Sequence, residues 1–264
     1  MSERIKKIFE KKGKKLVTFT TGGDPDVITS LEILKTIINN GIDIIEIGMP
    51  FSDPMADGPT IQESSVRSLA NGTKINDIFE IVTNIRKFNN EIPIILMGYY
   101  NSIFNLGIDN FATKCAETGV DGLIIVDLQP EEDSELLTKT KEKGIDLIRL
   151  ITPTTDQKRL ITILSNASGF LYYVTVTGIT GQNSANIDDL KNSINSIKSS
   201  TKLPIVAGFG IKNRNDVEQI STFTDGVVVG SSIVNIIKDN LSNKNKMINE
   251  IKVFTKDLKE GIKE

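Results

Sequence analysis

We predict from the sequence that the chain folds as a (β/α)8 barrel, the TIM-barrel class of α/β proteins. Its 264 residues suit such a barrel, which commonly has about 250. Eight short runs rich in β-branched residues recur along the chain, and a helical pattern follows each of them. Eight such repeats close into a barrel rather than an open sheet. We therefore expect a single domain over residues 1–264, with extra helices at both ends.

The predicted strands are apolar runs without a clean alternation of apolar and polar residues. This pattern is typical of parallel strands covered by helices, because both faces of such strands are buried. The second and the last runs are "DIIEIG" and "DGVVVGSS". The eight runs begin at Leu16, Asp43, Ile92, Asp121, Ile145, Gly169, Leu203 and Asp225.

The stretches between the strands have helical periodicity. In "DVITSLEILKTIINNG", Val27, Leu31, Leu34 and Ile38 share one helical face, and Gly41 is a typical residue for ending a helix. The segments "NDIFEIVTNIRKF" and "EEDSELLTKTKEKG" follow the same pattern.

Both ends of the chain are also predicted to be helical. Ile251, Phe254, Leu258 and Ile262 lie on one face of the last segment, and the residues before the first strand look helical too. We expect these two helices to cap or flank the barrel.

Only two loops are long enough to serve as lids. They follow the second strand, at residues 50–59, and the sixth strand, at residues 177–186. Both are expected at the C-terminal mouth of the barrel, where the active sites of barrel enzymes lie.

The composition indicates a soluble globular protein with a small ligand. Hydrophobic residues make up 39% and charged residues 25% of the chain, and the formal net charge is -3. There is no electrostatic reason to expect nucleic acid or an anionic membrane as a partner. No apolar run approaches the roughly 20 residues that span a bilayer, and the N-terminal segment does not resemble a signal peptide. We expect a cytoplasmic protein.

The absence of histidine limits the types of catalysis that the chain can carry out. A chain with no histidine cannot use a Ser-His or Cys-His nucleophile or a His-ligated metal. Acid-base chemistry must then come from carboxylates, lysine, tyrosine or water. The single cysteine, Cys115, lies in the helix-like stretch "FATKCAETG", and we interpret it as a small buried hydrophobic residue.

Glycine-bearing turns after the sixth, seventh and eighth strands indicate a phosphate site. Gly181, Gly210, Gly230 and Ser231 lie in "TGITG", "AGFGI" and "VGSS", the last of which leads into a helical pattern. Glycines let backbone N–H groups approach an anion, and a helix N-terminus adds partial positive charge. A single glycine of this kind is more often a simple turn, but three converging loops favour phosphate.

Glu46 stands in the middle of the second strand, between isoleucines. Burying an ionised, unpaired carboxylate is costly, so its pKa is expected to rise toward neutrality, where it can act as a general acid or base. The alternative is a structural carboxylate that is hydrogen-bonded to a neighbouring strand or loop.

Asp57 and Asp53 lie in the loop that follows. Both could simply form turns, as "ADG" and "SDP" often do. The loop also carries three prolines, which stiffen it, and a stiff loop can hold a catalytic side chain over the mouth of a barrel. Two carboxylates could then divide the proton transfers between them.

Other chemistries fit less well. A Schiff-base aldolase needs a lysine near the C-terminal end of a strand, whereas Lys15 and Lys202 lie where strands begin. An all-oxygen metal site would need a cluster of ligands that the sequence does not show, so we expect no metal.

The motifs "EIGMPFSDPMADGPTIQ", "YYVTVTGITG", "GFGI" and "GSSIVNII" resemble those of the tryptophan synthase alpha chain family, from about Leu16 to the C-terminus. The resemblance implies a retro-aldol cleavage of indole-3-glycerol phosphate to indole and glyceraldehyde 3-phosphate. It implies that Glu46 handles both proton transfers. It also implies that Asp57 accepts a hydrogen bond from the indole N–H and stabilises the cationic indolenine.

The same resemblance implies further site residues. Thr180, on the lid after the sixth strand, would approach Asp57 and close the site against water. Phe19, Ile61, Tyr172 and Phe209 match family positions that line the indole pocket, although such residues inside a barrel are by default core.

The family works as an α2β2 assembly with a tryptophan synthase beta chain. The resemblance implies that the alpha chain needs no cofactor, while the beta chain carries pyridoxal phosphate and receives indole through a tunnel. Asp53 and Pro54 are expected at the contact with the beta chain.

One position departs from the family pattern. After the fourth strand the chain reads "DLQPEE", with Gln129 where the family usually has a proline. The change restores a backbone donor and frees φ, so the resemblance does not fix the geometry of this loop.

The sequence is also compatible with two other functions. The chain could serve mainly to regulate a beta chain and channel indole to it, with a weakened site of its own. It could instead be a sugar-phosphate isomerase or epimerase, but such enzymes typically need histidine, lysine or a metal beside a glutamate, and the lack of histidine counts against that reading.

Overall fold

The computed structural model describes residues 1–174, 184–208 and 210–262, except for the side chains of residues 184–186. Within these residues the strands form one parallel sheet in the order β5-β4-β3-β2-β1-β9-β8-β7-β6. The strands are β1 Lys15–Thr21, β2 Ile44–Gly48, β3 Ile94–Gly98, β4 Gly122–Ile125, β5 Asp146–Leu147, β6 Arg149–Ile151, β7 Leu171–Val174, β8 Ile205–Gly208 and β9 Gly226–Val229.

The sheet closes at Ile148, which corrects one detail of the prediction. The fifth predicted strand is divided into β5, which pairs with β4, and β6, which pairs with β7. Only Ile148 separates these two strands, and its N–H donates to the carbonyl oxygen of Leu123 at 2.9 Å. The two edges of the sheet are therefore joined through the chain itself, and the predicted (β/α)8 barrel is confirmed.

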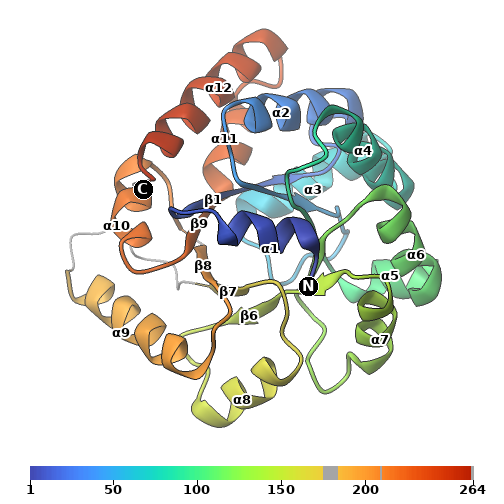
Figure 1. The fold of residues 1–264 in the computed structure, drawn as a ribbon. Helices are drawn as coiled ribbons and strands as arrows, with labels where there is room; N and C mark the ends of the chain where they lie inside the picture. Colours follow the sequence, from blue (N-terminus) through green and yellow to red (C-terminus); the bar gives the residue numbers. More distant parts are fainter. Residues whose placement is uncertain (175–183, 209, 263–264) are drawn as a thin grey trace.

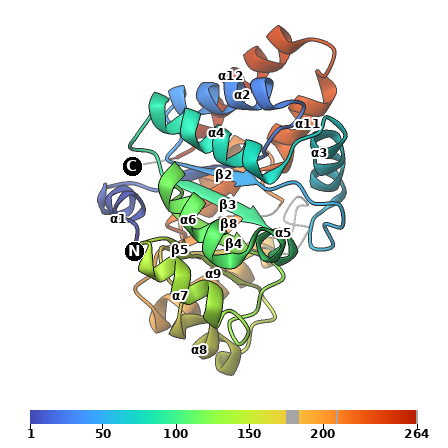
Figure 2. The ribbon, with the colours of Figure 1, turned by 90° about the vertical axis from the view of Figure 1, so that its right-hand side faces the viewer.

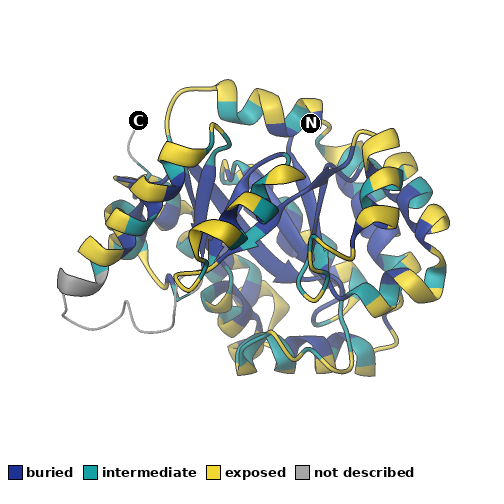
Figure 3. Cartoon of the chain, turned by 90° about the horizontal axis from the view of Figure 1, so that it is seen from below, coloured by how far each residue is buried: buried dark blue, intermediate teal, exposed yellow. Residues whose placement is uncertain are grey.

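Helices surround the barrel (Figures 1 and 2). Their outer faces are exposed while the strands are buried on both sides (Figure 3). The described helices are α1 Glu3–Glu10, α2 Val27–Asn39, α3 Pro59–Ala70, α4 Ile75–Phe88, α5 Tyr100–Leu106, α6 Ile108–Thr118, α7 Ser134–Glu142, α8 Gln157–Ser165, α9 Ser184–Ser200, α10 Arg214–Ser221, α11 Ser231–Asp239 and α12 Lys244–Glu260. None of these helices has the length and apolarity needed to cross a bilayer.

Helix α2 shows how local sequence sets the helix ends. The Asp26 side chain accepts a hydrogen bond from the Thr29 N–H at 2.8 Å and caps the first turn. Gly41, with a φ of +79°, follows the last turn as predicted. Of the four predicted face residues, Leu34 and Ile38 are buried with Ile33 and Ile37, whereas Val27 and Leu31 are half-buried.

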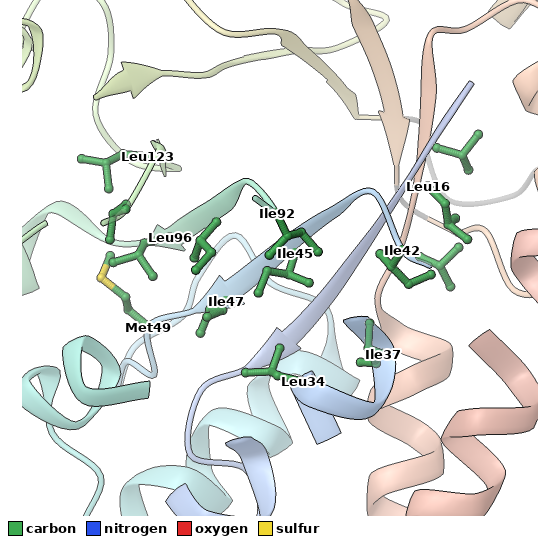
Figure 4. Packing of buried hydrophobic residues seen from close by; sticks show 14 of the residues in the cluster. Leu16, Leu34, Ile37, Ile42, Ile45, Ile47, Met49, Ile92, Leu96 and Leu123 are labelled. Carbon is green, nitrogen blue, oxygen red and sulfur yellow. The ribbon is translucent and has the colours of Figure 1, made fainter. Parts of the chain in front are cut away.

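The core has two layers, one inside the barrel and one between the strands and the helices. Successive side chains of a strand point to opposite faces, so residues two apart share a layer. On β2, Ile44 belongs to the inner layer, and Ile45 and Ile47 belong to the outer layer, where they pack near Leu34 of α2 (Figure 4). Glu46 therefore points into the barrel.

Helix α1 closes the N-terminal end of the barrel and α12 flanks it, as predicted. Ile5 is fully buried within the inner layer, and the ring of Phe9 lies 5.7 Å from that of Phe170. In Figure 1, α1 crosses the end of the barrel that faces the viewer. The Ser2 hydroxyl donates to Asp121 at 2.6 Å, immediately before β4. The opposite, C-terminal end is left for the loops that carry the candidate site.

Replacing Ile5 with alanine tests this closure. Because Ile5 is fully buried, Ile5→Ala should lower the free energy of unfolding by about 2–5 kcal/mol. Ile28→Ala is the matched control, since Ile28 on α2 is 76% exposed and the same truncation should change stability by no more than about 0.5 kcal/mol. Urea denaturation measures both values. An Ile5→Ala protein as stable as the parent would contradict the role given to α1.

Candidate active site

Glu46 lies inside the barrel in an environment that disfavours its charge. The residue is 1% exposed, and its Oε1 has no hydrogen-bond partner within the described residues. Burial raises the pKa of Glu46 to about 8, and the negative charge of Asp57 acts in the same direction. The carboxyl group is therefore mainly protonated at neutral pH, as expected from its place between isoleucines.

Asp57 lies in the loop of residues 49–58, between β2 and α3. Its backbone N–H donates to the Pro54 carbonyl at 3.0 Å, and its own carbonyl accepts from the Gln62 Nε2 at 2.9 Å. Pro59 then begins α3, a position where proline suits a helix because the first N–H groups lack partners. The loop and the helix together hold the Asp57 backbone from both sides.

The Asp57 carboxylate is half-buried and bonded to a tyrosine. Tyr99 Oη donates to Asp57 Oδ2 at 3.0 Å. Burial raises the pKa of Asp57, while this hydrogen bond lowers it because it favours the ionised form. The two carboxyl groups thus differ in setting: Glu46 is buried without such a donor, and Asp57 has one.

A narrow cavity of about 10 Å³ lies beside Asp57. Its wall includes Phe19, Ile61, Met97 and Tyr99, so two of the predicted indole-pocket residues line it. Gly48 also belongs to the wall, and a Cβ there would lie 2.6 Å from the Phe19 ring, so only glycine lets this ring occupy its position.

Tyr172 comes from β7 and belongs to the inner layer of the core. It is 8% exposed, and burial together with the charges of Glu46 and Asp57 raises its pKa well above the ordinary value. Its hydroxyl reaches the C-terminal end of β8, where a Cβ on Gly208 would clash with it.

The glycine turns after β8 and β9 lie at the same end of the barrel. Gly210 follows β8 with a φ of +82°, a conformation that favours glycine. Gly230 precedes α11, and a Cβ there would be 3.1 Å from the Cβ of Phe19. Ser231 is the first residue of α11, and Gly230 provides no side-chain cap for the N-terminus of this helix.

Three predicted site residues, Thr180, Gly181 and Phe209, lie outside the described residues. The predicted loop of residues 177–186 extends too far, because α9 already begins at Ser184.

The loop after β4 carries Gln129, the residue that departs from the family pattern. Gln129 is exposed, and its carbonyl accepts a hydrogen bond from the Glu132 N–H at 3.0 Å, so this loop forms a turn around Pro130.

Lys15 lies away from the candidate site. Lys15 lies at the start of β1, where its Nζ donates to the Gly13 carbonyl at 2.7 Å, at the end of the barrel opposite Asp57. Within the part of the chain that the structure describes, no group of acidic or sulfur side chains is suited to a metal. Cys115 is buried as predicted, and burial raises the pKa of its thiol.

Sequence reasoning missed Tyr99 and Met97 as site residues. Met97 lies in β3 and Tyr99 directly follows the strand, near its C-terminal end. This position was the available signal, because functional residues of barrels come from the C-terminal ends of strands and the loops after them.

Known proteins are similar to this chain over nearly its whole length. A family model described as tryptophan synthase alpha chain matches residues 5–263. The tryptophan synthase alpha chain of Zymomonas mobilis is 45% identical, over 98% of this chain and 96% of the relative. That of Petrotoga mobilis is 43% identical, over 97% of this chain and 98% of the relative.

Two of the solved structures that resemble this chain are of tryptophan synthases, like its relatives in sequence. Tryptophan synthase subunit alpha from Legionella pneumophila superposes with a TM-score of 0.91 at 35% identity, covering 99% of this chain and 98% of that one. A chain from a crystal structure of Mycobacterium tuberculosis tryptophan synthase gives a TM-score of 0.88 at 28% identity, covering 98% of each chain. The chain therefore belongs to the tryptophan synthase alpha chain family.

Proposed function

We propose that Glu46 and Asp57 carry out the lyase reaction of this family, the retro-aldol cleavage of indole-3-glycerol phosphate to indole and glyceraldehyde 3-phosphate in tryptophan biosynthesis. The observation that carries this proposal is the buried Glu46, whose pKa of about 8 keeps it protonated at neutral pH beside a second carboxyl group. A neutral acid inside the mouth of a barrel suits a reaction that begins with proton donation.

Glu46 serves as both acid and base in this scheme. Its proton goes to indole C3, which turns the ring into a cationic indolenine and an acceptor for electrons. The glycerol hydroxyl then gives its proton to the Glu46 carboxylate, the C–C bond breaks, and the bonding pair returns to the ring. Glu46 ends protonated again, so one group completes the cycle without net proton exchange.

Asp57 stays ionised while Glu46 is neutral. Its carboxylate accepts a hydrogen bond from the indole N–H and stabilises the positive charge that develops on the ring. Two nearby carboxyl groups do not readily ionise together, so the more buried Glu46 keeps its proton and Asp57 keeps its charge.

The remaining predicted residues hold the two ends of the substrate. Phe19, Ile61 and Tyr172 form apolar walls for the indole ring, together with Phe209. The phosphate binds to backbone N–H groups at the glycine turns and the start of α11, through Gly181, Gly210, Gly230 and Ser231. Thr180 closes over Asp57 once substrate is bound.

The family implies a beta-chain partner, and one of the similar chains comes from a crystal structure of tryptophan synthase in an open form. We infer an α2β2 assembly in which the beta chain holds pyridoxal phosphate and this chain needs no cofactor. The loop of residues 49–58 supports a contact there, since Asp53 and Met55 are exposed beside Pro54, and Met55 is 83% exposed. We also propose that residues 1–264 form one domain, because the helices at both ends pack on the barrel.

Removing either carboxyl group should nearly abolish indole release. Glu46→Gln and Asp57→Asn should each lower kcat by roughly two to four decades, the usual scale for a positioned acid or base. Glu80→Gln, on the exposed side of α4, is the matched control and should keep full activity. The assay is indole formation, with and without the beta chain.

Two results would count against this assignment. Undiminished turnover by Glu46→Gln would remove its acid-base role. A parent chain that accelerates the beta reaction but forms no indole in any condition would favour a purely regulatory function.

The raised pKa of Glu46 also predicts a pH-dependent stability. Between the ordinary pKa of 4.5 and the folded value of about 8, the folded chain keeps a proton that the unfolded chain has lost. The contribution of Glu46 to stability is therefore fully present below the unfolded pKa. As pH rises from that value to the folded pKa, the free energy of unfolding falls by about 1.4 kcal/mol per pH unit, and the contribution is lost once pH has passed the folded pKa. Glu46→Gln cannot ionise, so it should gain stability relative to the parent over this range.

Urea denaturation of the parent and Glu46→Gln at several pH values measures this gain. The difference between the two proteins is the informative quantity, because titration of all other groups largely cancels in it. A difference that does not change with pH would show that Glu46 titrates at its ordinary value in the folded chain.

A further inference from the structure

Tyr99 connects the strand β3 to the loop that carries Asp57. It follows Gly98, the last residue of β3, and precedes α5, which begins at Tyr100. Tyr99 is 3% exposed, so its side chain lies within the protein at the C-terminal end of the barrel, where it lines the cavity beside Asp57.

Three contacts of Tyr99 all reach residues 49–58. Its Oη donates to Asp57 Oδ2 at 3.0 Å and accepts from the Ala56 N–H at 2.9 Å. Its ring stacks on Phe51, with the centroids 5.0 Å apart and the planes 23° from parallel. One side chain directly after β3 therefore contacts both the first half and the end of the loop after β2.

The direction of the hydrogen bonds matters for the carboxylate. The Tyr99 hydroxyl accepts a hydrogen bond from the Ala56 N–H, and it therefore donates its own proton to Asp57 Oδ2. A donor polarised by a second hydrogen bond is a stronger donor to a carboxylate. With Oδ2 occupied in this way, Oδ1 is the oxygen left for the indole N–H.

We propose that Tyr99 is a positioning residue for the cleavage, whose hydroxyl orients the Asp57 carboxylate toward the indole N–H and holds it in its ionised form. The inference rests on the function proposed for Asp57. Tyr99 itself exchanges no proton with substrate, and it acts only through Asp57.

The charges around this pair support the same role. Burial and the charge of Asp57 raise the pKa of Tyr99, so the phenol keeps the proton that it donates. Asp127, after β4, also raises the pKa of Tyr99, and the charge of Asp57 in turn raises the pKa of Glu46 on β2 and of Tyr172 on β7. The hydrogen bond from Tyr99 lowers the pKa of Asp57.

Tyr99→Phe removes the hydroxyl and keeps the ring that stacks on Phe51. We expect kcat/KM for indole formation to fall roughly 10- to 100-fold, the range expected for a hydrogen bond to a charged group. Tyr100→Phe is the matched control: it deletes a hydroxyl from the adjacent tyrosine, which lines no part of the cavity beside Asp57, and it should change kcat/KM less than twofold.

A double-mutant cycle separates positioning from general structural damage. If Tyr99 acts through Asp57, then Tyr99→Phe should have little further effect in the Asp57→Asn background. The pH profile gives a second readout, and it does not require measuring the low activity of the double mutant. Losing the hydrogen bond raises the pKa of Asp57, so the acidic limb of kcat/KM should move to higher pH in Tyr99→Phe and stay in place in Tyr100→Phe.

The outcomes distinguish this inference from the proposed function. Equal losses from Tyr99→Phe in both backgrounds, an unmoved acidic limb, or unchanged kcat/KM would each overturn the role of Tyr99. Full activity of Asp57→Asn would instead overturn the role of Asp57 and, with it, the wider mechanism. Phe51→Leu, which keeps the hydroxyl and loses the ring stack, controls for loosening of the loop and should leave the acidic limb unmoved.

Discussion

Burial of one carboxyl group determines what this barrel can do chemically. Glu46 occupies an inward position on β2, in the same layer as Ile44, where an ionised carboxylate would lose its hydration without gaining a partner for Oε1. The group keeps its proton at neutral pH for that reason. It can then give that proton to a carbon atom and, once ionised, act as a base strong enough to take one from a hydroxyl.

The fold covers Glu46 at the N-terminal end of the barrel and places the loops of the candidate site at the C-terminal end. Ile5 of α1 fills the N-terminal end of the barrel, and the wall closes where β5 and β6 meet at Ile148. The C-terminal end carries loops instead, and Asp57 lies on one of them, half-buried and bonded to Tyr99. Two carboxyl groups thus have different surroundings because one comes from a strand and the other from a loop.

The sequence allowed the barrel, its strands and the inward carboxylate to be predicted, because buried parallel strands and amphipathic helices leave strong local patterns. The division at Ile148 could not be predicted, since the pairing of a tilted strand with two neighbours depends on the geometry of the closed barrel. Tyr99 was missed for a similar reason. It lies 42 residues from Asp57 in the chain, and only the side-by-side packing of β2 and β3 brings the two together.

The central claim is that Glu46 is a neutral acid at neutral pH, and infrared difference spectroscopy tests it most directly. Comparing the parent with Glu46→Gln isolates the signal of this one carboxyl group. We predict a protonated-carboxyl band at neutral pH that is absent from Glu46→Gln and that disappears with a midpoint near pH 8. A spectrum in which Glu46 contributes only a carboxylate signal at neutral pH would contradict the account.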